Sequence, residues 1–109
     1  CTDEDDMTDI LSNLAATIAA RASADADSSW TAKLLSQGPQ KCAEKFGEEA
    51  VEAIIAACSQ DDTALIGEGS DVLYHLQVML QSRGIAWADV LAELERRQGV
   101  CGIDEKAAR

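Results

Sequence analysis

Apolar side chains recur every three or four positions in four long stretches of this 109-residue chain. That spacing gathers them on one face of an α-helix. The stretches predict helices at about 8–22, 39–58 and 64–83, and a last helix from Trp87. Nineteen alanines, one proline and few aromatic residues favour helices over strands. The sequence therefore predicts an all-α protein, like a four-helix bundle.

Local signals add a short helix and define the boundaries. Ser28 or Ser29 can cap a helix of about 29–37, and the next helix can begin at Pro39. A connection of about five residues makes the helices at 39–58 and 64–83 antiparallel. Gly67 and Gly69 each cost a helix roughly 1 kcal/mol relative to alanine, so the second of these could instead begin at Ser70.

A single domain is expected, with its core at about 8–98, an acidic lead-in before it and a tail from residue 99. The net charge of −11 argues against nucleic acid as a partner. No run is long enough to span a membrane, and the acidic start does not resemble a signal peptide. A chain this short with several amphipathic helices leaves apolar surface to cover, which predicts a homo-oligomer, at least a dimer.

The four cysteines lack the spacing of a zinc or redox motif. They are expected to be reduced thiols in the cytoplasm, with Cys42 and Cys58 packed between helices.

The acidic residues form two groups on the two predicted antiparallel helices. Acids three or four positions apart share a helix face, so the two groups can turn toward each other. Carboxylates this close require a cation among them, and hard oxygen ligands suit Mg2+, with Mn2+ as a possible substitute. Taken singly, such pairs are also common on the solvated surface of acidic proteins. The groups are Glu48, Glu49 and Glu52, and then Glu68 and Asp71.

Three kinds of side chain could complete the site. Lys45 shares a stripe with Glu48 and Glu52, which favours contact with a phosphate; Lys41 is a weaker candidate. His75 shares a face with the second acidic group, where it either packs or contacts a ligand. Trp30 and Tyr74 could each stack on a base or fill the core.

Four segments resemble one family of enzymes. They are Ser29–Leu35, Lys45–Glu52, Asp71–Leu76 and Val90–Arg97, which are similar to segments of the phosphoribosyl-ATP pyrophosphohydrolases in the all-α, MazG-like superfamily. The resemblance implies Mg2+-dependent hydrolysis of phosphoribosyl-ATP to phosphoribosyl-AMP and pyrophosphate, the second step of histidine biosynthesis.

Roles follow from the same resemblance. It implies metal ligation by Glu49, Glu52, Glu68 and Asp71. It also implies catalytic roles for Glu48 and Glu49 and a substrate contact from Lys33, in addition to the contacts expected of Lys45 and His75. The alternatives are a house-cleaning nucleoside triphosphate pyrophosphohydrolase of the same superfamily and a non-catalytic acidic interaction module.

Overall fold

The computed structural model describes residues 6–98, and this part of the chain contains five α-helices and no strand. The all-α prediction, including its short second helix, is confirmed. No helix in residues 6–98 is long and apolar enough to cross a membrane. The predicted lead-in and tail fall mainly outside the described residues. The helices are α1 (Asp6–Arg21), α2 (Trp30–Ser36), α3 (Pro39–Ser59), α4 (Asp62–Ser82) and α5 (Trp87–Gln98).

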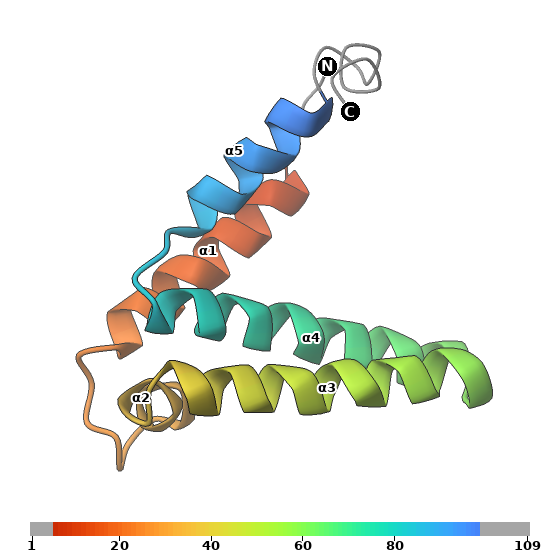
Figure 1. Ribbon diagram of the computed structural model, residues 1–109, viewed down its shortest axis with the longest axis horizontal. Coiled ribbons are helices and arrows are strands. Elements are labelled where there is room, and N and C mark those ends of the chain that lie inside the picture. The colour runs from red at the N-terminus through yellow and green to blue at the C-terminus, as the bar shows by residue number, and fades with distance from the viewer. Residues whose placement is uncertain (1–5, 99–109) are drawn as a thin grey trace.

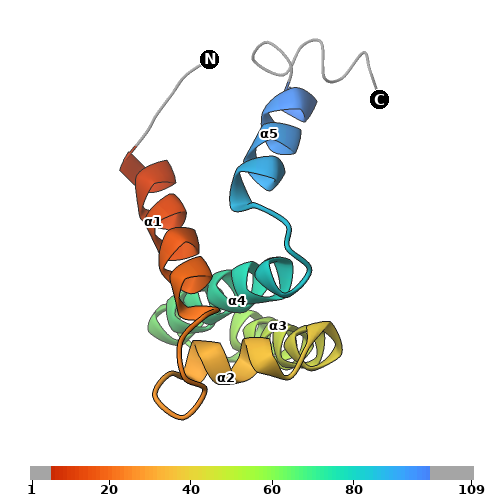
Figure 2. The same ribbon diagram turned by 90° about the vertical axis from the view of Figure 1, so that its left-hand side faces the viewer.

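Helix α4 organises the fold. It runs antiparallel to α3 in a long hairpin, as predicted, and also contacts α1, α2 and α5. Helices α1 and α5 rise steeply from the hairpin at the end where α4 finishes, and α2 crosses the hairpin at the same end (Figures 1 and 2). Helix α3 contacts only α4 and α2 among the described elements. The other end of the hairpin therefore projects away from the remaining helices.

The helix ends explain most of the boundaries. The hydroxyl of Ser29 accepts a hydrogen bond from the Ala32 amide at 3.2 Å and caps α2. Pro39 starts α3, where its missing N–H costs nothing. Gly84 has a φ of 73° just after α4, a conformation that favours glycine.

The start of α4 differs from the prediction. The carboxylate of Asp61 accepts from the Ala64 amide at 2.9 Å, so the helix begins at Asp62 and continues without a break through Gly67 and Gly69. The alternative start at Ser70 is wrong. A good N-terminal cap and packing against α3 offset the cost of two glycines.

The closed end of the molecule, where α1, α2 and the adjoining parts of α3 and α4 meet, contains the core. Its fully buried members are Ile18, Leu34, Cys42 and Val78. The prediction for Cys42 is confirmed, and burial raises the pKa of its thiol. Gln77 is also buried and ties α4 to α1, because its amide donates to the Leu11 carbonyl at 3.1 Å.

The projecting part of the hairpin is different, because several of its large apolar side chains are exposed. One prediction is wrong here: Cys58 is exposed instead of packed between helices. Leu73 on α4 is likewise 40% exposed. Burial of both would need a further layer of protein over the hairpin, which residues 6–98 do not supply. We call the exposed set the apolar hairpin face; it comprises Val51, Ile54, Ile55, Leu65, Ile66 and Leu73.

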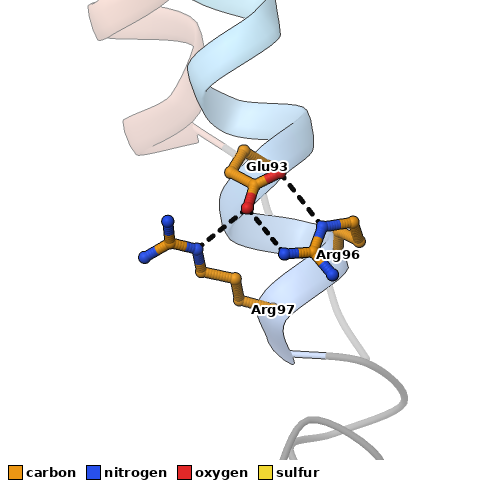
Figure 3. Close-up of polar contacts among 3 residues, drawn as sticks. All are labelled: Glu93, Arg96 and Arg97. Atoms are coloured by element: carbon orange, nitrogen blue, oxygen red, sulfur yellow. Dashed lines mark hydrogen bonds and ion pairs between the residues drawn. The ribbon is translucent and has the colours of Figure 1, made fainter. Parts of the chain in front are cut away.

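On the outer surface of α5, Glu93 forms ion pairs with two arginines (Figure 3). Arg97 Nε lies 2.9 Å from one carboxylate oxygen, and Arg96 Nη2 lies 2.7 Å from the same oxygen. Hydrogen bonds from Arg96 and Arg97 lower the pKa of Glu93 to about 2.

Candidate active site

Three carboxylates meet near the middle of the α3–α4 hairpin. Glu49 comes from α3, and Glu68 and Asp71 come from α4. Each offers an oxygen, and these oxygens all lie within 4.8 Å of one another. The spacing of three positions between Glu68 and Asp71 puts both on one face of α4. The antiparallel packing then brings Glu49 opposite to them.

The cluster carries uncompensated negative charge. Glu68 is only partly exposed, and its Oε1 atom is buried without a hydrogen-bond partner among the described residues. Desolvation raises the pKa of Glu68, and the negative charges of Glu52, Asp71 and Glu49 raise it further. Such an arrangement favours either a bound proton or a bound cation.

The donor set fits a hard divalent cation. All three groups present oxygen, which is the ligand that Mg2+ and Mn2+ prefer, and one of the oxygens is buried without a partner. Glu49, Glu68 and Asp71 are the residues that would hold the ion. Their convergence agrees with three of the four metal ligands implied by the resemblance.

Glu52 and Glu48 lie at the edge of this cluster on α3. Glu52 is exposed, and its charge acts on Glu68, but it is not part of the group of three converging oxygens. Glu48 accepts a hydrogen bond from Lys45 Nζ at 3.2 Å. The two residues therefore border the cluster instead of forming its centre.

His75 is buried on the side of α4 next to the acids, with an exposed fraction of 7%. Its ring makes an edge contact with Tyr74, and its Nδ1 atom has no hydrogen-bond partner within residues 6–98. Burial lowers the pKa of His75; Lys45 lowers it further, against raising effects led by Glu49. His75 is thus packed as one interpretation expects, and its contact with a ligand stays a prediction.

The lysines divide into two groups. Lys33 and Lys45 lie near the exposed indole of Trp30, with their Nζ atoms 6.0 and 5.9 Å from the ring centroid. Lys41 instead pairs with Glu44 at 3.3 Å, one turn earlier on α3. Of the lysines in residues 6–98, Lys45 pairs with Glu48 at the edge of the carboxylate cluster, and Lys33 lies near the same indole as Lys45.

Sequence reasoning missed the contact that positions α2 against the site. The hydroxyl groups of Thr31 and Tyr74 share a hydrogen bond between α2 and α4, next to His75. Thr31 is buried, although threonine on a short helix gives no signal of this from the sequence. Through this contact Tyr74 joins two helices. Trp30 differs, because it remains 54% exposed and does not fill the core.

Carboxylates that converge in this way can hold a divalent cation, and such a cation supports hydrolysis of phosphate compounds. Comparison with known proteins agrees. The family model of phosphoribosyl-ATP pyrophosphohydrolase matches residues 11–98. The chain belongs to this family.

Individual relatives cover almost the whole chain. A phosphoribosyl-ATP pyrophosphatase of Dinoroseobacter shibae is 67% identical over 92% of this chain and 98% of its own length. One of Ruegeria pomeroyi is 67% identical over 92% of this chain and 95% of its own. One of Paracoccus denitrificans is 62% identical over 91% of this chain and 92% of its own length.

Proposed function

We propose that this protein hydrolyses phosphoribosyl-ATP to phosphoribosyl-AMP and pyrophosphate. The observation that carries the proposal is the convergence of Glu49, Glu68 and Asp71, with a buried carboxylate oxygen that has no partner. Family membership and the activity for which the relatives are named support the substrate. We expect residues 1–109 to act as one cytoplasmic domain.

The ion is expected to be Mg2+, with Mn2+ as a substitute. When bound, it would neutralise charge on the phosphate oxygens and on the leaving pyrophosphate. Glu49, Glu68 and Asp71 would hold it, with Glu52 as the fourth ligand that the resemblance implies. The site of this chain supplies negative charge in excess, so affinity for a polyphosphate depends on the ion and the nearby lysines.

The chain's own side chains account for the remaining steps. A water molecule attacks phosphorus in the anhydride between the α- and β-phosphates, and the bond to the pyrophosphate oxygen breaks. Glu48 or Glu49 accepts the proton from the water. Lys45 and Lys33 contact phosphate oxygens, and the unpartnered Nδ1 of His75 is available for a hydrogen bond to the substrate.

A homo-oligomer, at least a dimer, is part of the proposal. The apolar hairpin face exposes three isoleucines, among them Ile66 at 70% and Ile54 at 61%. Covering such side chains contributes roughly 25 cal/mol for each Å2 of apolar area removed from water. A depression of about 610 Å3 beside the acids is lined only by α3, through Gly47, Glu48, Val51 and Glu52. A second copy over this face would supply its missing wall.

The test measures pyrophosphate release from phosphoribosyl-ATP by the purified protein, with Mg2+ and with a chelator. We expect turnover only with the ion. A nucleotide panel run in parallel tests the house-cleaning alternative: faster hydrolysis of deoxynucleoside triphosphates than of phosphoribosyl-ATP would contradict the proposed substrate. Absence of hydrolysis and of Mg2+ binding would leave the acidic surface as an interaction module.

A further inference from the structure

Trp30 leaves most of its large aromatic surface open to solvent. Its exposed fraction is 54%, whereas the other aromatic residues in the described part of the chain, Phe46, Tyr74 and Trp87, are all partly buried. An indole is a costly side chain to leave in water, because it carries more apolar area than almost any other. The three positions that α2 buries are Thr31, Ala32 and Leu34. The helix is thus anchored by other residues, and Trp30 is not needed for its packing.

The open indole is connected through Lys45 to Glu48 at the edge of the carboxylate cluster. Lys45 joins the two, since its Nζ atom is 5.9 Å from the Trp30 centroid and 3.2 Å from the Glu48 carboxylate. Lys33, one turn along α2, is 6.0 Å from the same ring. Both distances are at the outer limit for a cation–π contact, so neither ammonium group is closely seated on the ring. Aromatic surface, cations and acids therefore follow one another along the α2–α3 side of the site.

This order matches the chemical order of a nucleotide bound through its phosphates. A purine has a flat π-surface that stacks on an aromatic side chain, the phosphates need cations, and the sugar spans the gap between them. We infer that Trp30 is the stacking platform for the purine ring of the substrate, with Lys33 and Lys45 positioned for the phosphates that follow. This inference rests on the proposed function and assigns a part of the substrate to a residue outside the carboxylate cluster.

Stacking on an exposed ring acts on bound substrate and transition state alike. Trp30→Ala should therefore raise KM for phosphoribosyl-ATP about tenfold and change kcat little. Trp30→Tyr and Trp30→Phe keep a π-surface and should restore KM to within about threefold of wild type. A packed aromatic residue is also partly replaced by a smaller ring, so inhibitors are needed to separate stacking from packing.

Two inhibitors separate the base from the phosphates. AMP carries the purine, and inorganic pyrophosphate carries phosphates without a base. In Trp30→Ala, inhibition by AMP should weaken about tenfold, whereas inhibition by pyrophosphate should stay within about twofold of wild type. Equal weakening of both inhibitors, or of neither, would overturn the inference.

The two tryptophans of the chain supply a matched spectroscopic pair. Trp87→Phe retains Trp30 as the only fluorophore of its kind, and Trp30→Phe retains Trp87. AMP should quench the emission of Trp87→Phe and leave that of Trp30→Phe unchanged; the reverse pattern would overturn the assignment. Light scattering on Trp30→Ala completes the test, because a smaller assembly than wild type would assign the indole to an interface between copies. If wild type fails to hydrolyse phosphoribosyl-ATP, the proposed function fails; if wild type is active and Trp30→Ala keeps its KM, only this inference fails.

Discussion

The two ends of the α3–α4 hairpin have the same kind of sequence but different surroundings. At the closed end, Cys42 and Val78 are buried under α1 and α2. At the projecting end, Ile54 and Ile66 keep the same helical spacing and remain mostly exposed. Spacing thus identifies which face of a helix is apolar, but it does not identify what covers that face. The carboxylate cluster lies between the two ends, where the closed end positions it and the open end leaves it accessible.

The largest effect on activity is expected at the carboxylate cluster, between the two ends of the hairpin. Alanine at Glu49, Glu68 or Asp71 removes one of three converging ligands and should lower Mg2+-dependent turnover by roughly 10³-fold or more. Pyrophosphate release measures the loss, and circular dichroism checks that the helices persist. The same substitution at Glu52 should have a similar effect if it supplies the fourth ligand. Wild-type turnover in any two of the four variants would remove the metal-site assignment.

Adding a charge to the projecting end tests whether its exposed apolar side chains form an interface. Ile66→Glu puts a carboxylate into the apolar hairpin face, and a buried unpaired charge should weaken self-association at least about a hundredfold. Light scattering at micromolar concentration should then show monomer. Ile10→Glu is the matched control, because Ile10 is 63% exposed on α1 and is not part of the apolar hairpin face. If Ile66→Glu assembles like wild type, the apolar hairpin face is not the interface.

A substitution at Lys45 tests whether a cation on the closed-end side of the carboxylate cluster contributes to activity. Lys45→Ala removes a cation next to the acids and should lower kcat/KM about tenfold to a hundredfold, at the cost of one charge-assisted hydrogen bond. Steady-state kinetics gives the value, and the melting temperature should change little because the ion pair is partly exposed. Lys41→Ala, which breaks only the Glu44 pair, should keep wild-type kinetics. Equal kcat/KM in the two variants would assign Lys45 to the solvated surface.

Glu68→Gln should stabilise the metal-free protein while removing its response to Mg2+. The raised pKa of Glu68 means that its charged form is disfavoured in the fold. Metal-free wild type should therefore gain stability as the pH falls and this carboxyl takes up a proton, and lose it as the pH rises. A Tm about 2–5 °C above that of metal-free wild type at pH 8, narrowing toward pH 5, is expected for Glu68→Gln.

Mg2+ supplies the control for this result. The ion should raise the Tm of wild type, since it binds only the folded state, and should leave Glu68→Gln nearly unchanged. Thermal melts at two pH values, with and without Mg2+, test both statements. A metal-free Tm that falls in the variant would mean that the Glu68 carboxylate is satisfied in the native protein.

The sequence predicts most of the fold because local signals dominate it. Helical spacing, the Ser29 cap and the Gly38–Pro39 junction act within a few residues and need no tertiary information. The Asp61 cap belongs to the same class of signals, and it outweighs the two glycines that made the start of α4 ambiguous. Burial is less predictable from sequence, since the exposure of Leu73 and Cys58 depends on how far α3 and α4 project beyond the other helices.

The site was predictable in its residues more than in its arrangement. The spacing of Glu68 and Asp71 puts both on one helix face, and an antiparallel partner brings Glu49 to them. No spacing rule places α2 beside the hairpin. The contact of Thr31 with Tyr74, the exposure of Trp30 and the distance from its ring to Lys45 follow from that packing. They required the structure.

The smallest effect is expected at Glu93, which lies on α5 and outside the α3–α4 hairpin. Its carboxylate is paired with two arginines, but all three side chains are exposed to water, so the pairs contribute little. Glu93→Gln should lower the Tm by about 1–3 °C at neutral pH and leave turnover unchanged.

The pH dependence gives the sign of this effect. The pKa of Glu93 is about 2 in the fold, below its ordinary value, so its pairing stabilises fully above about pH 5 and is lost as the pH falls toward 2. The gap between wild type and Glu93→Gln should narrow over that range, and also in high salt. Glu95→Gln is the control, because it removes the same charge from an exposed position on the same helix that forms no ion pair within residues 6–98. A pH-independent gap for Glu93→Gln would show that the two arginines stabilise α5 through packing of their side chains instead of through charge.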